Sequence, residues 1–270
     1  MNNKGNFVEL SKTGKIWAIG SIHSNLEAFY SIKEHIIKNF KSDDKLVILG
    51  NVIGLGEYSK ETLTSLLDLR FNLMSKFKLD PQSIIFLRGA QEEMFSKLLQ
   101  LHLAPNPTEI VEWMFEHGVN KTINSYGFSE NEVKNIASSG TMQISKWTSN
   151  LNKSIQLRPG HIQYFLNLKH AAYSHTKKIL FVNRGVDTTR PLSAQNDCFW
   201  WGFQNFSKIQ APYKTFIRIV RGYESEHCDQ SNIIKNQVVC TLFKQPLSNK
   251  NILCGIFGTN GEILDLFENN

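Results

Sequence analysis

Three short apolar segments of this chain each lead into a loop of glycine and small polar residues. The loops begin with Gly20-Ser21-Ile22-His23, Gly50-Asn51-Val52 and Gly89-Ala90-Gln91. Loops at the carboxyl ends of parallel strands are where α/β proteins usually bind ligands. Carboxylates placed there could hold divalent cations and activate a water molecule. The chain instead offers hydroxyl, imidazole and amide groups, which indicates a ligand pocket without the charges for metal-dependent chemistry.

The elements that must position these loops alternate between strand and helix over residues 15–101. Strands are predicted at residues 15–19, 45–49 and 83–87. Asn25 is placed to cap a helix through residue 39, and Ser59 to cap a second helix towards residue 73. A third helix is predicted at residues 92–101. This order implies right-handed crossovers and a sheet covered by helices.

The rest of the chain predicts a helical insertion followed by further strands. Pro105 and Pro107 interrupt the pattern, and we expect a helical cap inserted at about 102–160 and a short helix through Leu168. Strands are then predicted at residues 171–174, 178–182, 215–220, 237–242, 251–257 and 262–267. The expected fold class is α/β, with two packed mixed β-sheets flanked by helices in a four-layer sandwich. Residues 1–270 are expected to form a single domain.

Composition and charge narrow the class of protein. A hydrophobic fraction of 41% and a charged fraction of 20% are typical of a globular domain, and no apolar run approaches a membrane span. The N-terminus lacks a run of signal-peptide type, so we expect a cytoplasmic protein without a membrane partner. Four widely spaced cysteines without a CxxC pair argue against a structural zinc site. The net charge of +6 indicates a mildly basic surface, with nucleic-acid binding as the less favoured alternative.

The order of the loops resembles the calcineurin-like metallophosphoesterases, in the branch of bacterial serine/threonine phosphatases and diadenosine tetraphosphate hydrolases. That family carries the motifs GDIHG, GDYVDRG, GNHE, HAG and a final GH or RAH. The matching stretches here are Gly20-Ser21-Ile22-His23-Ser24, Gly50-Asn51-Val52-Ile53-Gly54-Leu55-Gly56, Gly89-Ala90-Gln91-Glu92, Asn183-Arg184-Gly185 and Arg221-Gly222-Tyr223. The resemblance covers roughly residues 15–265 and implies the two-sheet fold described above.

Matched residue by residue, the resemblance implies a degenerate active site. The positions of the family's metal ligands hold Ser21, His23, Asn51, Ala90, Asn183 and Tyr223. Only His23 keeps its ligand chemistry. Gln91 stands at the position of the general-acid histidine and cannot deliver a proton at neutral pH. Leu55 and Gly54 stand where the family has a phosphate-contacting arginine and an aspartate.

Electrostatics favours an inactive protein. Two divalent cations held about 3.5–4 Å apart repel strongly, and anionic ligands must offset that repulsion. Because the matched side chains are neutral, we predict a pseudophosphatase with no catalytic residue and no metal cofactor. The alternative is an active phosphoesterase that binds Mn, Fe or Zn through relocated ligands, for which Glu57, Glu92 and Glu93 are the candidates. A nucleic-acid-associated module is the second alternative.

The pocket could still bind a ligand. Three arginines follow the predicted strands and could neutralise a phosphate without a metal, or pair with nearby carboxylates. The residues of this vestigial pocket are Ser21, His23, Asn51, Arg88, Gln91, Asn183, Arg184, Arg221 and Tyr223. We expect a protein partner or a phosphorylated small molecule to bind there. The aromatic run at residues 199–203 predicts core packing, with a partner surface as the alternative.

Overall fold

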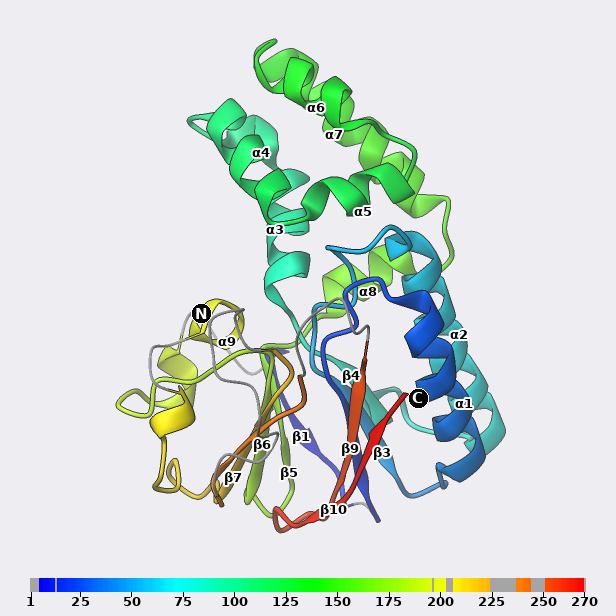
Figure 1. Cartoon of the computed structure of the whole chain (residues 1–270), viewed down its shortest axis with the longest axis vertical. Helices are drawn as coiled ribbons and strands as arrows, with labels where there is room; N and C mark the ends of the chain where they lie inside the picture. Colours follow the sequence, from blue (N-terminus) through cyan, green and yellow to red (C-terminus); the bar gives the residue numbers. More distant parts are fainter. Residues whose placement is uncertain are drawn as a thin grey trace.

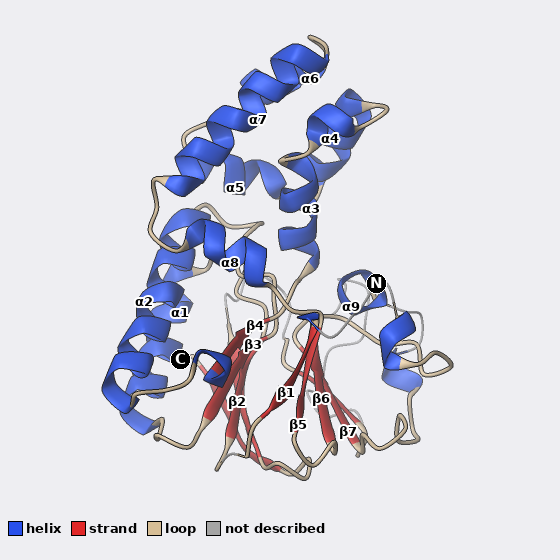
Figure 2. Ribbon diagram, turned by 180° about the vertical axis from the view of Figure 1, so that it is seen from behind, coloured by secondary structure: helices blue, strands red, loops and turns tan. Residues whose placement is uncertain are grey.

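Two five-stranded β-sheets pack face to face in the computed structural model, which describes residues 5–12, 14–195, 197–202, 206–223, 237–243 and 251–269. Long helices cover the outer face of one sheet, and a group of helices rises above both sheets (Figures 1 and 2). Both sheets mix parallel and antiparallel pairs. The predicted α/β class with two packed mixed sheets is therefore confirmed.

One sheet carries the three polar loops. Its strands lie in the order β10-β9-β2-β3-β4. The strands β2 (Ile16–Ile19), β3 (Lys45–Ile48) and β4 (Ile84–Phe86) are parallel neighbours, so their carboxyl ends and the loops that follow lie at one edge of the sheet. The strand β9 (Leu253–Phe257) runs antiparallel to β2 and pairs with β10 (Ile263–Glu268).

The other sheet has the strand order β1-β5-β6-β7-β8. Its strands are β1 (Phe7–Leu10), β5 (Ala171–Ser174), β6 (Ile179–Val182), β7 (Arg218–Arg221) and β8 (Val239–Thr241). The strands β5 and β6 form the predicted antiparallel hairpin. The sequence pattern did not predict β1, which pairs in parallel with β5. The prediction placed the start of β7 too early, because Tyr213 and Phe216 close a turn before it.

Four helices pack close to the loop-bearing sheet. They are α1 (Leu26–Asn39), α2 (Ser59–Phe77), α3 (Ala90–Leu98) and α8 (His161–Asn167). Asn25 caps α1 as predicted, and its side chain accepts a hydrogen bond from the Ala28 amide. The prediction that Ser59 caps α2 was wrong, because Ser59 is the first helical residue after Tyr58. The buried Ser59 hydroxyl instead bonds the hydroxyls of Ser24 and Thr122.

The segment predicted as a cap consists of helices. They are α4 (Pro107–Glu116), α5 (Val119–Ser125), α6 (Glu130–Ala137) and α7 (Thr141–Gln156), drawn in green above the sheets in Figure 1. Shorter helical turns are η2 (Pro81–Ser83), η3 (Leu101–Leu103), η4 (Leu192–Ala194), α9 (Cys198–Trp201) and η5 (Phe206–Lys208). In the part of the chain that the structure describes, no helix has the length and apolar character needed to cross a membrane.

Alternating side chains divide the core into layers. In β2, Ile16 and Ala18 pack between the two sheets, while Trp17 and Ile19 pack against the helices. A third cluster covers the outer face of the β1-containing sheet and includes Phe199 and Trp200, which are 1% and 7% exposed. The aromatic run therefore packs in the core at Phe199 and Trp200, Trp201 is partly buried against it, and the last residue, Phe203, lies outside the described residues. This outer layer consists of short helices and loops rather than long helices.

Candidate functional site

The loops that follow β2, β3, β6 and β7 meet in one place and are tied together by backbone hydrogen bonds. The Ile22 and His23 amides donate to the Asn51 carbonyl at 3.0 and 2.8 Å. The Ser21 amide donates to the Gly222 carbonyl at 2.9 Å, and the Gly222 amide donates to the Asn183 carbonyl at 2.8 Å. The structure therefore brings the motif residues of the vestigial pocket together at the carboxyl ends of the strands.

The backbone of these loops is strained. Seven non-glycine residues of the described chain have positive φ, and four of them lie here: His23, Ser24, Asn51 and Leu55, with φ between 49° and 62°. Left-handed backbone of this kind clusters at ligand sites, where the surrounding structure must maintain it. The loops thus have left-handed backbone of a kind that is common at ligand sites, while the side chains at the matched ligand positions are neutral.

Asn51 lies at the centre of a network of neutral groups. Its Nδ2 donates to Ser21 Oγ at 3.3 Å, and its Oδ1 accepts from the backbone N–H of Gln91 at 3.1 Å. The three side chains are 1–6% exposed. Since the Asn51 side chain already uses its acceptor and a donor within the protein, it is held in place as a structural link rather than left open to a cation.

Gln91 fills the space beside Gly54. Its Nε2 donates to the His117 carbonyl at 2.8 Å, while its Oε1 is buried without a hydrogen-bond partner among the described residues. A Cβ atom built on Gly54 would lie 1.9 Å from Gln91 Oε1, and Gly54 has a φ of +84°. A side chain at position 54 would therefore require Gln91 to move and would strain the backbone.

His23 is buried at 6% exposure beneath two aromatic rings. The imidazole lies 5.2 Å from the Tyr223 ring and 6.2 Å from the Phe243 ring, centroid to centroid, and meets both edge to face. Neither ring nitrogen has a hydrogen-bond partner among the described residues. Burial lowers the pKa of His23 to about 3, so the imidazole is neutral at physiological pH.

Asn183 is fully buried, and among the described residues only the nitrogen of its side-chain amide forms a hydrogen bond. Its Nδ2 donates to the Leu49 carbonyl at 2.6 Å, while its Oδ1 has no hydrogen-bond partner within the described part of the chain. The contact with Leu49 turns the amide towards the end of β3. The buried oxygen left over at this position is therefore neutral.

The three predicted arginines have different environments. Arg88 pairs with Glu93 at 2.5 Å, and its guanidinium lies 5.8 Å from the Trp200 ring. Arg221 is 5% exposed, donates from Nε to Thr241 Oγ1 at 2.9 Å and stacks on Phe206. The half-buried Arg184 lies 5.5 Å from the Tyr223 ring. Of the three, Arg184 is the one placed beside the rings that cover His23.

The candidate replacement carboxylates are all engaged elsewhere. Glu92 is fully buried and accepts hydrogen bonds from the amides of Asn51, Val52 and Gly89 and from the Tyr164 hydroxyl. Burial raises the pKa of Glu92, and these backbone hydrogen bonds oppose that shift. Glu93 pairs with Arg88 and Lys97, and the exposed Glu57 pairs with Lys121. Relocation of one of them to the pocket would break these contacts.

The donor set does not fit a pair of metal ions. Among the described residues, the acceptors at these positions that have no hydrogen-bond partner are the His23 imidazole and the amide oxygens of Gln91 and Asn183, which are all neutral. Over the residues that the structure describes, no three histidine, cysteine, aspartate or glutamate side chains gather closely enough to hold a metal ion. Two divalent cations held about 3.5–4 Å apart need anionic ligands to offset their repulsion, and these side chains supply none.

Some residues of the pocket carried little signal in the sequence. Phe243 lies in the segment after β8, and its ring packs against His23, which follows β2. This contact exists only because β2 and β8, which are far apart in the sequence, are brought together by the fold. The His117 carbonyl, which holds Gln91, comes from the end of α4. Glu92 could have been recognised as a structural carboxylate, because it lies three residues after Gly89 in the first turn of α3, where a side chain can reach back to the helix start.

Comparison with known proteins agrees with this geometry at the level of the fold. No protein-family model matches the chain, and no curated protein matches its sequence. Among solved structures, a candidate diadenosine tetraphosphatase is similar with a TM-score of 0.57 and 13% identity over 98% of this chain and 97% of that one. A cold-active protein tyrosine phosphatase is similar with a TM-score of 0.51 and 12% identity over 96% and 80% of the two chains. A mutant of a cold-active protein tyrosine phosphatase has a TM-score of 0.51 and 11% identity. The chain thus has a metallophosphoesterase-like fold.

Proposed function

We propose that this protein is a catalytically inactive phosphoesterase, which uses its vestigial pocket to bind a phosphorylated ligand or partner in the cytoplasm. The observation that carries the proposal is the neutral donor set around His23. The pocket offers an imidazole and two amide oxygens where a binuclear enzyme needs carboxylates. Without two bound cations there is no activated water and no neutralisation of charge developing on phosphorus.

The state of the rest of the pocket supports the same proposal. Gln91 fills the space beside Gly54, and Glu92 holds the backbone of the second loop. These side chains stabilise the loop conformation from within the protein, so that bound metal ions are not needed to maintain it. The protein is therefore expected to fold without metal.

Arg184 supports a role in binding phosphate. Its guanidinium lies over the Tyr223 ring, and no aspartate or glutamate among the described residues forms an ion pair with it. A half-buried guanidinium at the rim of a neutral pocket can pair with a phosphate monoester in a bidentate manner. We expect phosphoserine to bind the wild-type protein, and Arg184→Gln to weaken that binding by about tenfold.

The main test is metal analysis of the purified protein combined with a phosphatase assay. We expect less than one equivalent of manganese, iron or zinc to co-purify, and no metal-dependent hydrolysis of an aryl phosphate. Two bound equivalents together with hydrolysis would overturn the proposal and favour an active enzyme with relocated ligands.

The second test restores charge at two matched positions. The double variant Ser21→Asp, Asn51→Asp should remain inactive, because Ala90, Gln91, Asn183 and Tyr223 still lack the family's ligand and acid chemistry. The assay is hydrolysis of the same aryl phosphate with added Mn²⁺, with the wild-type protein as the control. Metal-dependent turnover by the double variant would contradict the account.

A further inference from the structure

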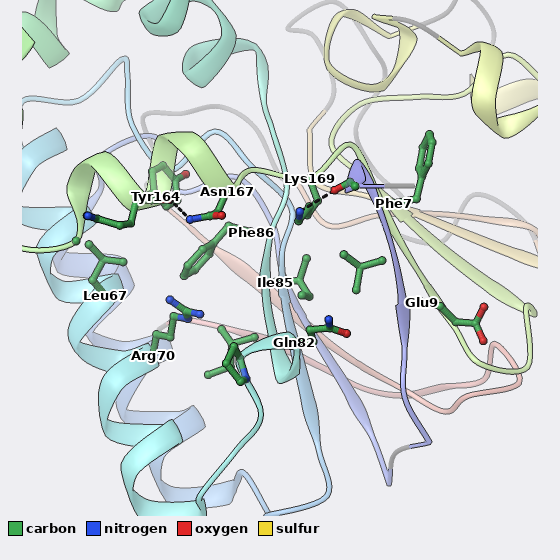
Figure 3. A pocket seen from close by; sticks show the side chains of 16 residues that line it. Phe7, Glu9, Leu67, Arg70, Gln82, Ile85, Phe86, Tyr164, Asn167 and Lys169 are labelled. Carbon is green, nitrogen blue, oxygen red and sulfur yellow. Dashed lines mark hydrogen bonds between the residues drawn. The ribbon is translucent and has the colours of Figure 1, made fainter. Parts of the chain in front are cut away.

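A cavity of about 710 Å³ lies beside the end strands of the two sheets and shares no lining residue with the vestigial pocket. It is bordered by β1 and β4, which are the end strands of the two sheets, and by α2 and α8 (Figure 3). The size is typical of sites for small organic ligands. Neither the resemblance nor the proposed function assigns it a role.

The chemically unusual side chain in this cavity is Arg70. It projects from α2 into the cavity in Figure 3, and its guanidinium lies 5.7 Å from the centre of the Phe86 ring. Its Nε is buried without a hydrogen-bond partner, and no carboxylate of the described chain forms an ion pair with it. Burial lowers the pKa of Arg70, and no acidic group offsets that effect.

A half-buried cation without a partner costs folding free energy. A structural arginine in such a place is normally paired with a carboxylate or a carbonyl group. The contact of Arg70 is therefore the Phe86 ring, and its guanidinium has no anionic partner among the described residues. This leaves the guanidinium available to a negatively charged group in the cavity.

The remaining walls give the shape and polarity of that partner. Phe86 and Leu67 provide apolar surface close to Arg70. Gln82 and Asn167 add neutral amide groups at the rim, and Lys169 donates to the Gly5 carbonyl at 2.7 Å. The single acidic residue of the lining, Glu9, hydrogen-bonds Tyr173 and lies far from Arg70 in Figure 3.

We propose that this cavity binds a small organic carboxylate, whose charged group pairs with Arg70 while its apolar body packs on Phe86 and Leu67. The guanidinium fork matches a carboxylate in a bidentate arrangement, and the apolar walls favour a ligand that carries a ring or an alkyl chain. One available guanidinium balances one negative charge. A phosphate monoester carries close to two charges, and Lys169, the other cation of the lining, already donates to the Gly5 carbonyl, so the lining favours the single charge of a carboxylate.

The test compares each acid with its uncharged amide in the wild-type protein. The probes are benzoate, phenylacetate and hexanoate, with benzamide, phenylacetamide and hexanamide as matched neutral partners and phenyl phosphate as a further arm. Calorimetry or ligand-observed NMR gives the affinities. We expect at least one acid to bind saturably and its amide to bind at least about tenfold more weakly.

Three variants locate the site. Arg70→Gln should weaken binding of the acid at least about tenfold. Gln163→Trp, a change at an exposed lining residue of α8, should block the cavity while leaving Arg70 in place. Lys146→Gln removes a positive charge from the exposed surface of α7 and should leave binding unchanged. Gln163→Trp keeps the test decisive if Arg70→Gln fails to fold.

The proposal is overturned if none of the acids binds saturably, if acid and amide bind equally, or if Arg70→Gln and Lys146→Gln behave alike. Tighter binding of phenyl phosphate than of every carboxylate would overturn the choice of ligand class. These outcomes are independent of the metal analysis, since the cavity shares no lining residue with the vestigial pocket.

Discussion

The vestigial pocket around His23 and the cavity beside Arg70 differ in how far their polar groups are buried and hydrogen-bonded. Around His23 the side chains at the matched ligand and acid positions are neutral, mostly buried and partly linked to each other or to the backbone. The charged Arg184 lies at the rim, beside the Tyr223 ring. Beside Arg70 the space remains open, and a charged group has no counter-ion among the described residues. The difference teaches that the buried centre where a fold usually performs chemistry can become neutral and filled, while open space beside a cation lies elsewhere in the same chain.

The two regions are also physically connected. Tyr164 lines the cavity, and its hydroxyl donates to Glu92 Oε1 at 3.2 Å. Glu92 in turn holds the amides of Asn51 and Val52 in the second loop of the vestigial pocket. A single buried carboxylate thus links the packing of α8 to the conformation of the loop.

The largest effect is expected from removing that carboxylate. Glu92→Ala leaves the buried amides of Asn51, Val52 and Gly89 without their acceptor, and should lower the free energy of unfolding by at least about 4 kcal/mol. Urea denaturation measures the change. The control is Glu57→Ala, which removes an exposed ion pair and should cost less than about 1 kcal/mol. Equal costs for the two variants would show that Glu92 does not hold the loop.

The next largest effect tests whether the vestigial pocket is filled. Gly54→Asp introduces a side chain where Gln91 lies and a φ of +84° is required, and should cost about 3 kcal/mol. Adding Gln91→Ala should restore part of that loss, because it removes the clash but not the backbone strain. Thermal or urea unfolding of the single and double variants gives the coupling. If the two changes simply add, Gln91 does not occupy the space.

A somewhat smaller effect comes from the protonation of His23. The unfolded chain binds a proton at His23 below about pH 6.5, while the folded protein does so only near pH 3. The contribution of the neutral His23 to the free energy of unfolding is therefore complete above pH 6.5 and is lost as the pH falls towards 3. At pH 5 the loss amounts to about 2 kcal/mol.

The measurement compares unfolding of the wild-type protein and His23→Asn at pH 7.5 and pH 5. Asparagine tolerates the left-handed backbone at this position. Between pH 7.5 and pH 5, the free energy of unfolding of the variant should fall by about 2 kcal/mol less than that of the wild-type protein. His161 and His170, whose pKa values burial lowers to about 4, titrate in both proteins and cancel in the difference. An unchanged pH dependence would mean that His23 is hydrated.

The smallest effect concerns Arg70 and sharpens the contrast with the pocket. Replacement by methionine removes an unpaired cation and keeps the apolar stem, so Arg70→Met should change the free energy of unfolding by less than about 0.5 kcal/mol or increase it slightly. Urea denaturation in the absence of small acids measures this. A loss of several kcal/mol would show that Arg70 has a structural partner and would remove the argument for a ligand.

Much of the fold could be predicted because local sequence signals agree with the tertiary structure. Apolar segments followed by glycine-rich loops marked β2, β3 and β4, and the polar Asn25 before an apolar periodic segment marked the start of α1. β1 escaped prediction because its exposed Glu9 and half-buried Phe7 give little periodic signal, and its pairing with β5 spans more than 160 residues of sequence. The loss of charge in the motifs was visible in the residue types alone.

The contents of the vestigial pocket were only partly visible in the sequence. Residue types alone did not distinguish whether Arg88 pairs with a carboxylate or remains available, and the structure places Glu93 against it. The cavity beside Arg70 had no sequence signal, because its walls come from three separate parts of the chain: β1, the segment from α2 to β4, and α8.

The amino-acid sequence by itself determined which chemical groups stand after each strand, and hence that the expected metal ligands are neutral. Only the tertiary structure decided which of these groups hydrogen-bond each other, which carboxylate supports the loops, and where a cation is left without a partner. The physical reason is that residue type fixes charge and hydrogen-bonding capacity locally, while burial and partnership depend on segments that meet only after the chain has folded.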